Sequence, residues 1–135
     1  MILPQFFSWA GMTFELVAMM HRQQLCRALR IGTVSGCYSW NGASPAGTGA
    51  QIDLVLEWKG ERTDYVVEIK FSESVFSIDA AYEMNLRGKL DAFVHSKKHN
   101  AVHSVNLVLL TTFGLSKGIH NAPVDTGLTM DALFE

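Results

Sequence analysis

The chain has 135 residues, of which 48% are hydrophobic and 18% are charged, and its formal net charge is −2. This length and apolar content are enough to bury one hydrophobic core, so we expect a single domain that spans residues 1–135. The small negative charge excludes a uniformly basic, nucleic-acid-binding surface, and any attraction for phosphate must therefore be local.

The cysteines and the apolar segments exclude further classes of protein. Cys26 and Cys37 have no CxxC spacing, which argues against a disulfide framework and against a structural zinc site. No apolar run approaches the roughly 20 residues of a membrane span, and residues 1–4 do not resemble the start of a signal peptide. We therefore expect a cytoplasmic protein with reduced thiols and no contact with a membrane.

An amphipathic helix is predicted over residues 13–30. Thr13 is a suitable N-cap and Gly32 a suitable stop, which leaves residues 1–12 as a short helical turn or a loop. Glu15 lies in the first turn, where a carboxylate favours the helix dipole. His21 on the apolar face is expected to be a packed histidine and not a metal ligand. The residues of this face, at helical spacing, are Phe14, Val17, Ala18, His21, Leu25, Ala28 and Leu29.

Three strands are predicted next. Residues 33–40 form a short strand, and residues 41–49 are the most loop-like stretch of the chain. Residues 51–58 and 65–71 alternate between two faces, and the polar turn over residues 59–64 joins them as a hairpin. In the first strand of the hairpin, one face carries Ile52, Leu54, Leu56 and Trp58, and the other carries Asp53, Val55 and Glu57. In the second, one face carries Tyr65, Val67, Ile69 and Phe71, and the other carries Val66, Glu68 and Lys70.

The hairpin places a small group of charged side chains on an otherwise apolar sheet. Period two puts Glu68 and Lys70 on one face, roughly 6–7 Å apart, and pairing of the strands brings Asp53 beside them. Two neighbouring carboxylates are costly to ionise together, and a divalent cation such as Mg²⁺ or Mn²⁺ removes that cost. A nearby lysine can orient the attacking water and offset charge on phosphorus. Ordinary solvated charges on a strand face are the alternative.

The remainder of the chain predicts a second helix and two more strands. The helix spans residues 80–97 with Asp79 as its N-cap, and Gly88 inside it costs about 1 kcal/mol relative to alanine. Close packing against the sheet is the expected reason for this glycine. Residues 104–112 form a nearly continuous apolar strand, typical of a central position. Residues 116–127 are predicted to be a loop, and residues 128–134 a short strand and a turn.

Three histidines, His95, His99 and His103, are spaced four residues apart after this helix. They would share one face only on a continuous helix, but residues 100–101 favour a helix end, and no carboxylate or thiol joins the histidines as a ligand. We therefore interpret them as part of a mildly basic surface patch, which can lie near a nucleic-acid backbone.

Several segments together resemble the PD-(D/E)XK nuclease superfamily. Asp53, then fourteen residues, then Glu68-Ile69-Lys70 is similar to the D…ExK core signature of that superfamily. From Trp9 to Phe134 the chain also resembles the nuclease-like domain found at the C-terminus of certain bacterial AAA-type ATPases. The segments that carry this resemblance are Trp9–Glu15, Ser39-Trp40, Gly49–Leu54, Glu68–Ser72, Tyr82–Lys89, Thr111–Leu115 and Asp131–Phe134. No Walker loop occurs, so we expect a free-standing or an excised domain.

The resemblance implies an α/β fold with a restriction-endonuclease-like αβββαβ core, in which helices flank a mixed sheet. It implies a divalent-metal-dependent nuclease that hydrolyses phosphodiester bonds, with DNA as the expected substrate and Mg²⁺ or Mn²⁺ as the cofactor. An AAA-type ATPase module is an expected partner. A homodimer is a further expectation, because nucleases that cut duplexes often dimerise.

The resemblance also implies roles for particular residues. Asp53 and Glu68 would bind the metal, with the backbone carbonyl of Ile69 as a further ligand. Lys70 would position the attacking water, and Glu15 would complete the acidic cluster.

Three further residues are expected to assist at this site. Gln51 would assist near the metal or the phosphate. Basic residues of the second helix would contact the phosphate, and Lys89 is preferred to Arg87. The alternative to this enzyme is a non-catalytic nuclease-like module that docks onto, or regulates, a partner.

Overall fold

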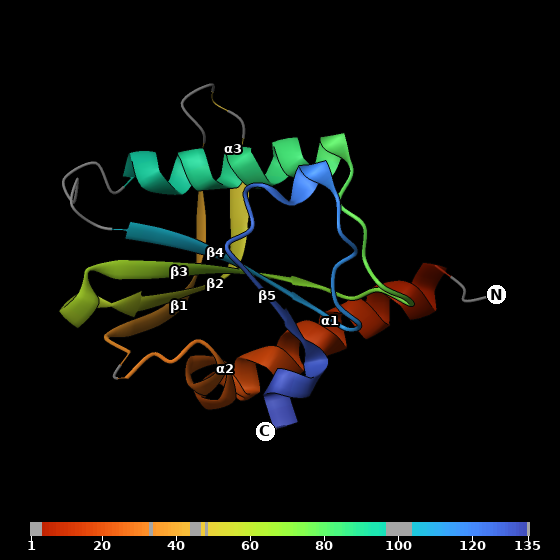
Figure 1. Cartoon of the computed structure of the whole chain (residues 1–135), viewed down its shortest axis with the longest axis horizontal. Coiled ribbons are helices and arrows are strands. Elements are labelled where there is room, and N and C mark those ends of the chain that lie inside the picture. Colours follow the sequence, from red (N-terminus) through yellow and green to blue (C-terminus); the bar gives the residue numbers. More distant parts are fainter. Residues whose placement is uncertain (1–3, 33, 44–46, 48, 97–103, 135) are drawn as a thin grey trace.

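The computed structural model describes residues 4–32, 34–43, 47, 49–96 and 104–134 (Figure 1). Its helices and strands are, in order, α1 (Pro4–Met20), α2 (Arg22–Ala28), β1 (Gly36–Ala43), β2 (Gly49–Trp58), β3 (Thr63–Lys70), α3 (Ala80–Ser96), β4 (Ser104–Thr111) and β5 (Thr126–Thr129). Short 3-10 turns cover Lys59–Glu61, Ile119–Asn121 and Met130–Phe134. Among these residues, no helix is long and apolar enough to cross a membrane.

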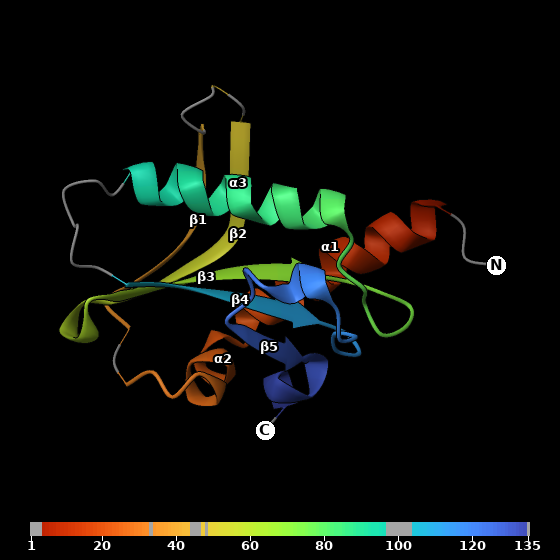
Figure 2. The ribbon, with the colours of Figure 1, turned by 45° about the horizontal axis from the view of Figure 1, so that its top comes forward.

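The five strands form one mixed sheet in the order β1-β2-β3-β4-β5. β2 is antiparallel to both of its neighbours, β1 and β3, whereas β3, β4 and β5 run parallel. Helix α3 connects β3 to β4 and covers one face of the sheet, and α1 and α2 lie on the other face (Figures 1 and 2). This arrangement confirms the predicted α/β fold and the mixed sheet with flanking helices. The connection through α3 joins two parallel neighbours, β3 and β4.

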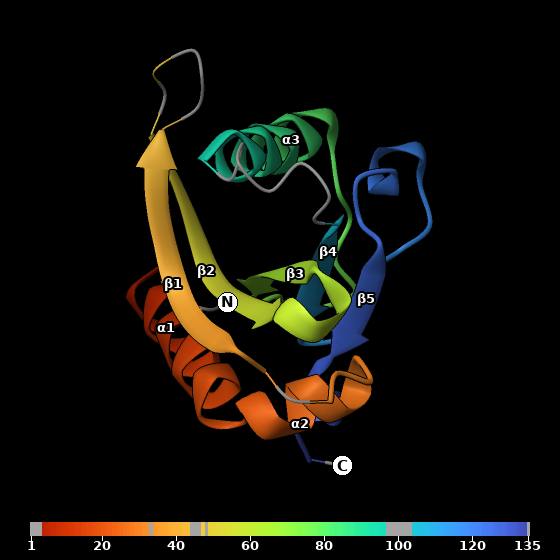
Figure 3. The same cartoon turned by 90° about the vertical axis from the view of Figure 1, so that its left-hand side faces the viewer.

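Each face of the sheet packs its own hydrophobic cluster. The cluster towards α1 and α2 contains Phe14, Ala18, Leu25, Leu54, Leu56, Val67, Ile69, Val108, Leu110 and Leu133. The cluster towards α3 contains Ile52, Val55, Val66, Leu86, Phe93, Leu107 and Leu109. Residues of β4 alternate between the two clusters, as expected for a central strand that is covered on both faces. Figure 3 shows β1 and β2 curving around the α3 side, where the rings of Trp40 and Phe93 meet edge to face at 5.5 Å.

The first helix begins earlier than the sequence pattern predicted. Thr13 is inside α1 and not at its N-cap, and its hydroxyl donates to the carbonyl of Trp9 at 2.9 Å. A threonine can satisfy its hydroxyl in this way without ending a helix. Pro4 is the first residue of α1, a position that needs no amide hydrogen and suits the fixed φ of proline. The prediction of a turn or loop over residues 1–12 is therefore wrong for residues 4–12.

The predicted helix over residues 13–30 is also divided at His21. His21 lies between α1 and α2, and its Nδ1 donates to the carbonyl of Val17 at 2.7 Å. Its ring meets the ring of Phe134 edge to face, with centroids 5.5 Å apart. The interpretation of His21 as a packed histidine is confirmed.

The end of α2 is set by Arg30 and not by Gly32. The amide of Ile31 donates to the carbonyl of Cys26 at 2.9 Å, and the amide of Arg30 donates to that of Arg27 at 3.1 Å. These two bonds form a Schellman motif, which requires a left-handed residue after the helix. That residue is Arg30, with φ of 59°, so the predicted glycine stop was placed two residues too late.

A β-bulge in β2 corrects the predicted faces of the hairpin. Tyr38 pairs with Val55 but Trp40 pairs with Ile52, so two steps along β1 correspond to three steps along β2. The extra residue turns Ile52 towards the α3 cluster, whereas Leu54 packs towards α1. Ile52 therefore does not share a face with Leu54, because a bulge interrupts strict alternation.

The second predicted helix agrees closely with α3. Asp79 caps it as expected, since its carboxylate accepts from the amide of Tyr82 at 2.8 Å. The expected reason for Gly88 is wrong, because a Cβ built at this position meets nothing within 4 Å in the part of the chain that the structure describes. His95 is exposed at the end of α3, whereas His99 and His103 lie outside the described residues.

Replacing Arg30 by glycine should stabilise the fold by about 0.5–1 kcal/mol. Relief of the left-handed strain, about 1–2 kcal/mol, exceeds the extra backbone entropy that glycine loses, about 0.5–1 kcal/mol. The measurement is urea unfolding of Arg30→Gly beside Ala28→Gly, in which glycine enters the last helical residue. The control should lose up to about 1 kcal/mol. Equal loss in both variants would show that the strain at Arg30 is negligible.

Candidate active site

Two carboxylates hold β2 and β3 together at the point where their regular pairing ends. The antiparallel register runs from Trp58 opposite Thr63 to Leu54 opposite Val67. Beyond that pair, the carboxylate of Asp53 accepts from the amide of Ile69 at 2.9 Å, and that of Glu68 accepts from the amide of Asp53 at 3.3 Å. Side-chain oxygens thus replace the carbonyls that a continued ladder would supply. The predicted approach of Asp53 to Glu68 is confirmed.

Glu15 reaches this pair from α1. Partial burial raises the pKa of the Glu15 carboxyl above its ordinary value of 4.5. The charge of Asp53, a hydrogen bond to the Asp53 side chain and the charge of Glu68 raise it further, while Lys89 acts in the opposite direction. The sequence-predicted acidic cluster is therefore assembled from three separate elements, namely α1, β2 and β3.

Glu68 is buried and is paired with a lysine from α3. Its side chain is 4% exposed, and Lys89 Nζ lies 2.5 Å from its Oε1. Burial and the neighbouring Asp53 raise the pKa of Glu68, and the hydrogen bond and charge of Lys89 lower it in part. Lys89, which the sequence marked as a phosphate-binding candidate, is thus the described residue that makes the ion pair with Glu68.

Lys70 lies on the same strand as Glu68 but points between two aromatic rings. Its Nζ is 5.7 Å from the ring centroid of Phe76 and 5.7 Å from that of Tyr82, within the range of a cation–π contact. Both rings line a cavity of about 520 Å³ together with Lys70, so Lys70 borders an open space at the end of β3.

Tyr82 is a residue of this site that the sequence analysis did not identify. Burial raises the pKa of its hydroxyl well above its usual range, and the charges of Glu68 and Asp53 add to the effect. Both carboxylates therefore lie close enough to Tyr82 to affect its hydroxyl. A signal was available: Tyr82 and Lys89 are seven residues apart on one predicted helix, which places both on the same helical face.

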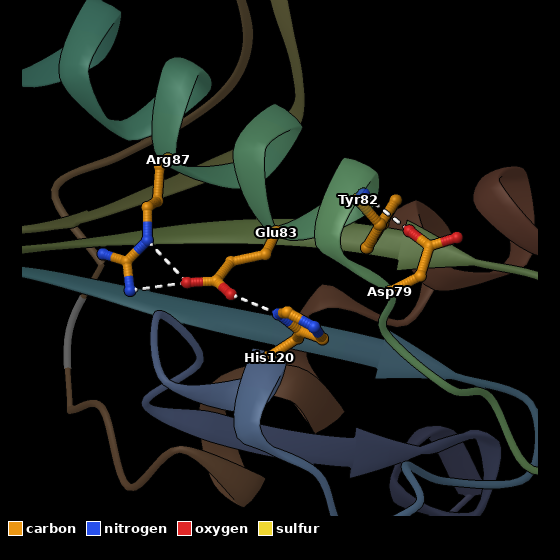
Figure 4. Close-up of polar contacts among 5 residues, drawn as sticks. All are labelled: Asp79, Tyr82, Glu83, Arg87 and His120. Carbon is orange, nitrogen blue, oxygen red and sulfur yellow. Dashed lines mark hydrogen bonds and ion pairs between the residues drawn. The ribbon is translucent and has the colours of Figure 1, made fainter.

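Gln51 and Arg87 have different surroundings. Gln51 lines a groove of about 440 Å³ with Lys89, at the edge of the acidic cluster. Arg87 instead pairs with Glu83, with both Nε and Nη2 lying 2.7 Å from Oε2 (Figure 4). His120 Nδ1 contacts the other oxygen of Glu83 at 2.7 Å, and these contacts lower the pKa of that carboxyl. The structure does not bring Arg87 to the acidic cluster.

The donor set of the cluster suits a hard cation. Within the part of the chain that the structure describes, no group of three or more His, Cys, Asp or Glu side chains is placed to hold a metal ion. Mg²⁺, however, commonly uses one or two carboxylates, together with waters and substrate phosphates. Asp53 and Glu68 match that requirement. The pKa of Glu68 is raised first by burial and then by the charge of Asp53, and Lys89 lowers it in part. The role of the Ile69 carbonyl stays a prediction.

A larger cavity, of about 730 Å³, lies between α2 and the start of β1. Its lining includes Arg22, Arg27, Cys26 and Cys37 but no carboxylate. Burial raises the pKa of the Cys26 thiol, with a smaller contribution from Cys37, so this thiol is a poor nucleophile at neutral pH. We place the candidate active site at the acidic cluster for this reason.

Comparison with known proteins supplies a fold and no function. No family model matches the chain, and the search of curated proteins finds no match. One similar solved structure is described as a protein of unknown function, AF1548, with 16% sequence identity and a TM-score of 0.50. The match covers 87% of this chain, which spans 64% of that protein. At this identity the similarity shows the fold alone.

Removing one charge from the cluster should stabilise the metal-free protein. Glu15→Gln eliminates repulsion with Asp53 and Glu68, and the gain should be below about 1 kcal/mol because solvent screens the exposed part of Glu15. A raised carboxyl pKa means that the folded state binds the proton more tightly than the unfolded state does. The charge of Glu15 therefore lowers the free energy of unfolding by its full amount above the pKa that Glu15 has in the folded state. Below pH 4.5 this loss of stability is absent.

Thermal unfolding in a chelator, at pH 7.5 and at pH 4, measures this difference. Glu73→Gln, at an exposed turn, is the matched control and should change the melting temperature little at either pH. A lower melting temperature for Glu15→Gln at pH 7.5 would contradict the expected repulsion.

Proposed function

We propose that this protein is a divalent-metal-dependent nuclease that hydrolyses phosphodiester bonds of DNA in the cytoplasm. The observation that carries the proposal is the contact between Asp53 and Glu68 at the divergence of β2 and β3, with Lys70 two residues further along β3. The resemblance of these residues to the D…ExK signature supports the same assignment. Neither the fold nor the similar solved structure is part of this support, because one fold hosts many functions.

Asp53 and Glu68 are the residues that would hold Mg²⁺ or Mn²⁺, with Glu15 beside them. A bound cation of this kind supplies Lewis-acid stabilisation of the phosphoryl oxygens and a more acidic water. The chain provides the ligands in a fixed position, because both carboxylates are tied to backbone amides of the opposing strand. Such fixed carboxylates need little rearrangement when the substrate arrives.

Two lysines and one amide near the carboxylates have complementary roles. Lys70 orients the attacking water and offsets negative charge at phosphorus, as a flexible ammonium group at the rim of a cavity can do. The rings of Phe76 and Tyr82 flank its ammonium group, each with its centroid 5.7 Å from Nζ. Lys89 balances Glu68 in the free protein and contacts a substrate phosphate in the complex. Gln51 donates to the substrate strand from the start of β2.

A non-catalytic module is the second candidate, and one observation favours it. Four apolar side chains of α1, spaced three to four residues apart, are exposed by 60% or more: Trp9, Met12, Leu16 and Met20. Exposed apolar patches often mark contacts with partners. In this alternative, α1 docks onto an AAA-type ATPase module or a second copy of the chain, and the acidic cluster only joins the strands.

Binding of Mn²⁺ should raise the melting temperature of the wild type and not that of Asp53→Asn. The amide variant keeps an oxygen that can accept from the Ile69 amide, so it removes the charge without removing the strand contact. At 100 times the dissociation constant, the wild type should gain about 2.7 kcal/mol. Differential scanning fluorimetry with and without Mn²⁺ measures the shift. An equal shift in both proteins would place metal binding elsewhere.

Cleavage of DNA should depend on Lys70. Lys70→Met keeps an apolar stem between Phe76 and Tyr82 but has no charge, and it should lower the rate by about 10²–10⁴-fold. The assay is cleavage of plasmid and of single-stranded DNA in Mg²⁺ or Mn²⁺. Lys59→Met, at the far end of the hairpin, is the matched control and should cleave as the wild type does.

A chelator should abolish cleavage by the wild type. Equal rates for wild type and Lys70→Met would assign the activity to a contaminant. No metal-dependent cleavage by the wild type would remove the nuclease proposal and favour the non-catalytic module.

A further inference from the structure

A groove runs from the acidic cluster along the first half of α3. Its volume is about 440 Å³, which is within the range of small-molecule sites. One wall is the start of β2, with Gly49, Ala50 and Gln51, and the other is α3, with Met84 and Gly88 among its residues. Lys89 joins the groove to the cluster, because it lines the groove and also pairs with Glu68.

The groove is open because two of its lining positions are glycines. A Cβ built at Gly49 or at Gly88 meets no atom of the described residues within 4 Å. Gly88 lies in the interior of a 17-residue helix, where alanine is the better residue. Since no neighbour forbids a side chain there, packing does not explain the glycine. A ligand that approaches the α3 backbone does explain it.

The residues that line the groove indicate which part of a substrate enters it. Lys89 is its cation, and it lies at the end next to the cluster, where a phosphate belongs. The other lining residues are uncharged: amides at Gln51 and Asn85, the 75% exposed side chain of Met84, and small residues. Amides can bond to the Watson–Crick edge of a base, and a methionine sulfur contacts aromatic rings favourably. In a duplex the Watson–Crick edge is occupied by the pairing partner, and the ring faces are covered by the stacked neighbours.

We propose that this groove binds one unpaired nucleotide of the substrate strand, next to the phosphodiester at the acidic cluster. The inference rests on the proposed function and narrows it to single-stranded DNA or to DNA with an unpaired segment. Gly88 is the specificity-determining residue, since any long side chain there occupies the place of the base.

The test is fluorescence anisotropy of a labelled single-stranded oligodeoxynucleotide and of the blunt duplex of the same sequence. Binding is measured in Mg²⁺ with Lys70→Met as the parent, so that the strand is not cut. Three variants are added to this parent: Gly88→Met, which fills the groove, Gly88→Ala, which does not, and Gly118→Met. Gly118 is the matched control, because its Cβ also meets no atom within 4 Å and its φ of 179° suits any residue.

The parent should bind the single strand about tenfold more tightly than the duplex. Adding Gly88→Met should weaken binding of the single strand by about the same factor. Gly88→Ala and Gly118→Met should bind as the parent does. The melting temperature of Gly88→Met should not fall below that of the parent, which separates a filled groove from a damaged fold.

The outcomes distinguish this inference from the function on which it rests. Unchanged single-strand binding by Gly88→Met, or a preference for the duplex, would overturn the inference. If the wild type still cleaved DNA in a Lys70-dependent manner, the proposed function would stand. Absence of both binding and metal-dependent cleavage would overturn the two together.

Discussion

The reciprocal contacts between Asp53 and Glu68 determine the shape of the site. Each carboxylate accepts from a backbone amide of the opposing strand, where the regular ladder of β2 and β3 has ended. Beyond this point β2 is free to bend, and a bulge between Ile52 and Val55 follows in its pairing with β1. The bend carries the start of β2 around α3 (Figure 3). The same two side chains therefore end the ladder and form the acidic cluster.

Stability and chemistry make opposite demands on these residues. Burial raises the pKa of Glu68, and repulsion among carboxylates adds to the effect at both Glu68 and Glu15. An apolar pair would avoid this cost, so the cluster is a local weakness of the metal-free fold. Lys89 offsets part of it through a short ion pair. A group of charges that the fold does not fully balance is typical of a site that binds a cation or a charged ligand.

Different sides of helix α3 contribute to the hydrophobic core, to the acidic cluster with its groove, and to a set of ion pairs. Its inner side buries Leu86 and Phe93 and anchors the helix to the sheet. Tyr82 and Lys89 extend from it to the acidic cluster, and Gly88 leaves open the groove beside them. The opposite side holds Glu83, bound by Arg87 and His120, which ties α3 to the segment between β4 and β5 (Figure 4). A helix fixed in this way can present a groove without closing it.

The sequence pattern predicts the fold class, the hairpin, α3 with its Asp79 cap, and the proximity of Asp53 to Glu68, because each follows from local periodicity and short-range pairing. It misplaced the start of α1 and the end of α2, where Thr13 and Arg30 adopt conformations that their neighbours allow but do not require. Packing between elements sets three further features: the pairing of Lys89 with Glu68, the position of Lys70 between two rings, and the open space at Gly88. All three depend on how α3 and the segment before it lie against the sheet, which no local periodic pattern specifies.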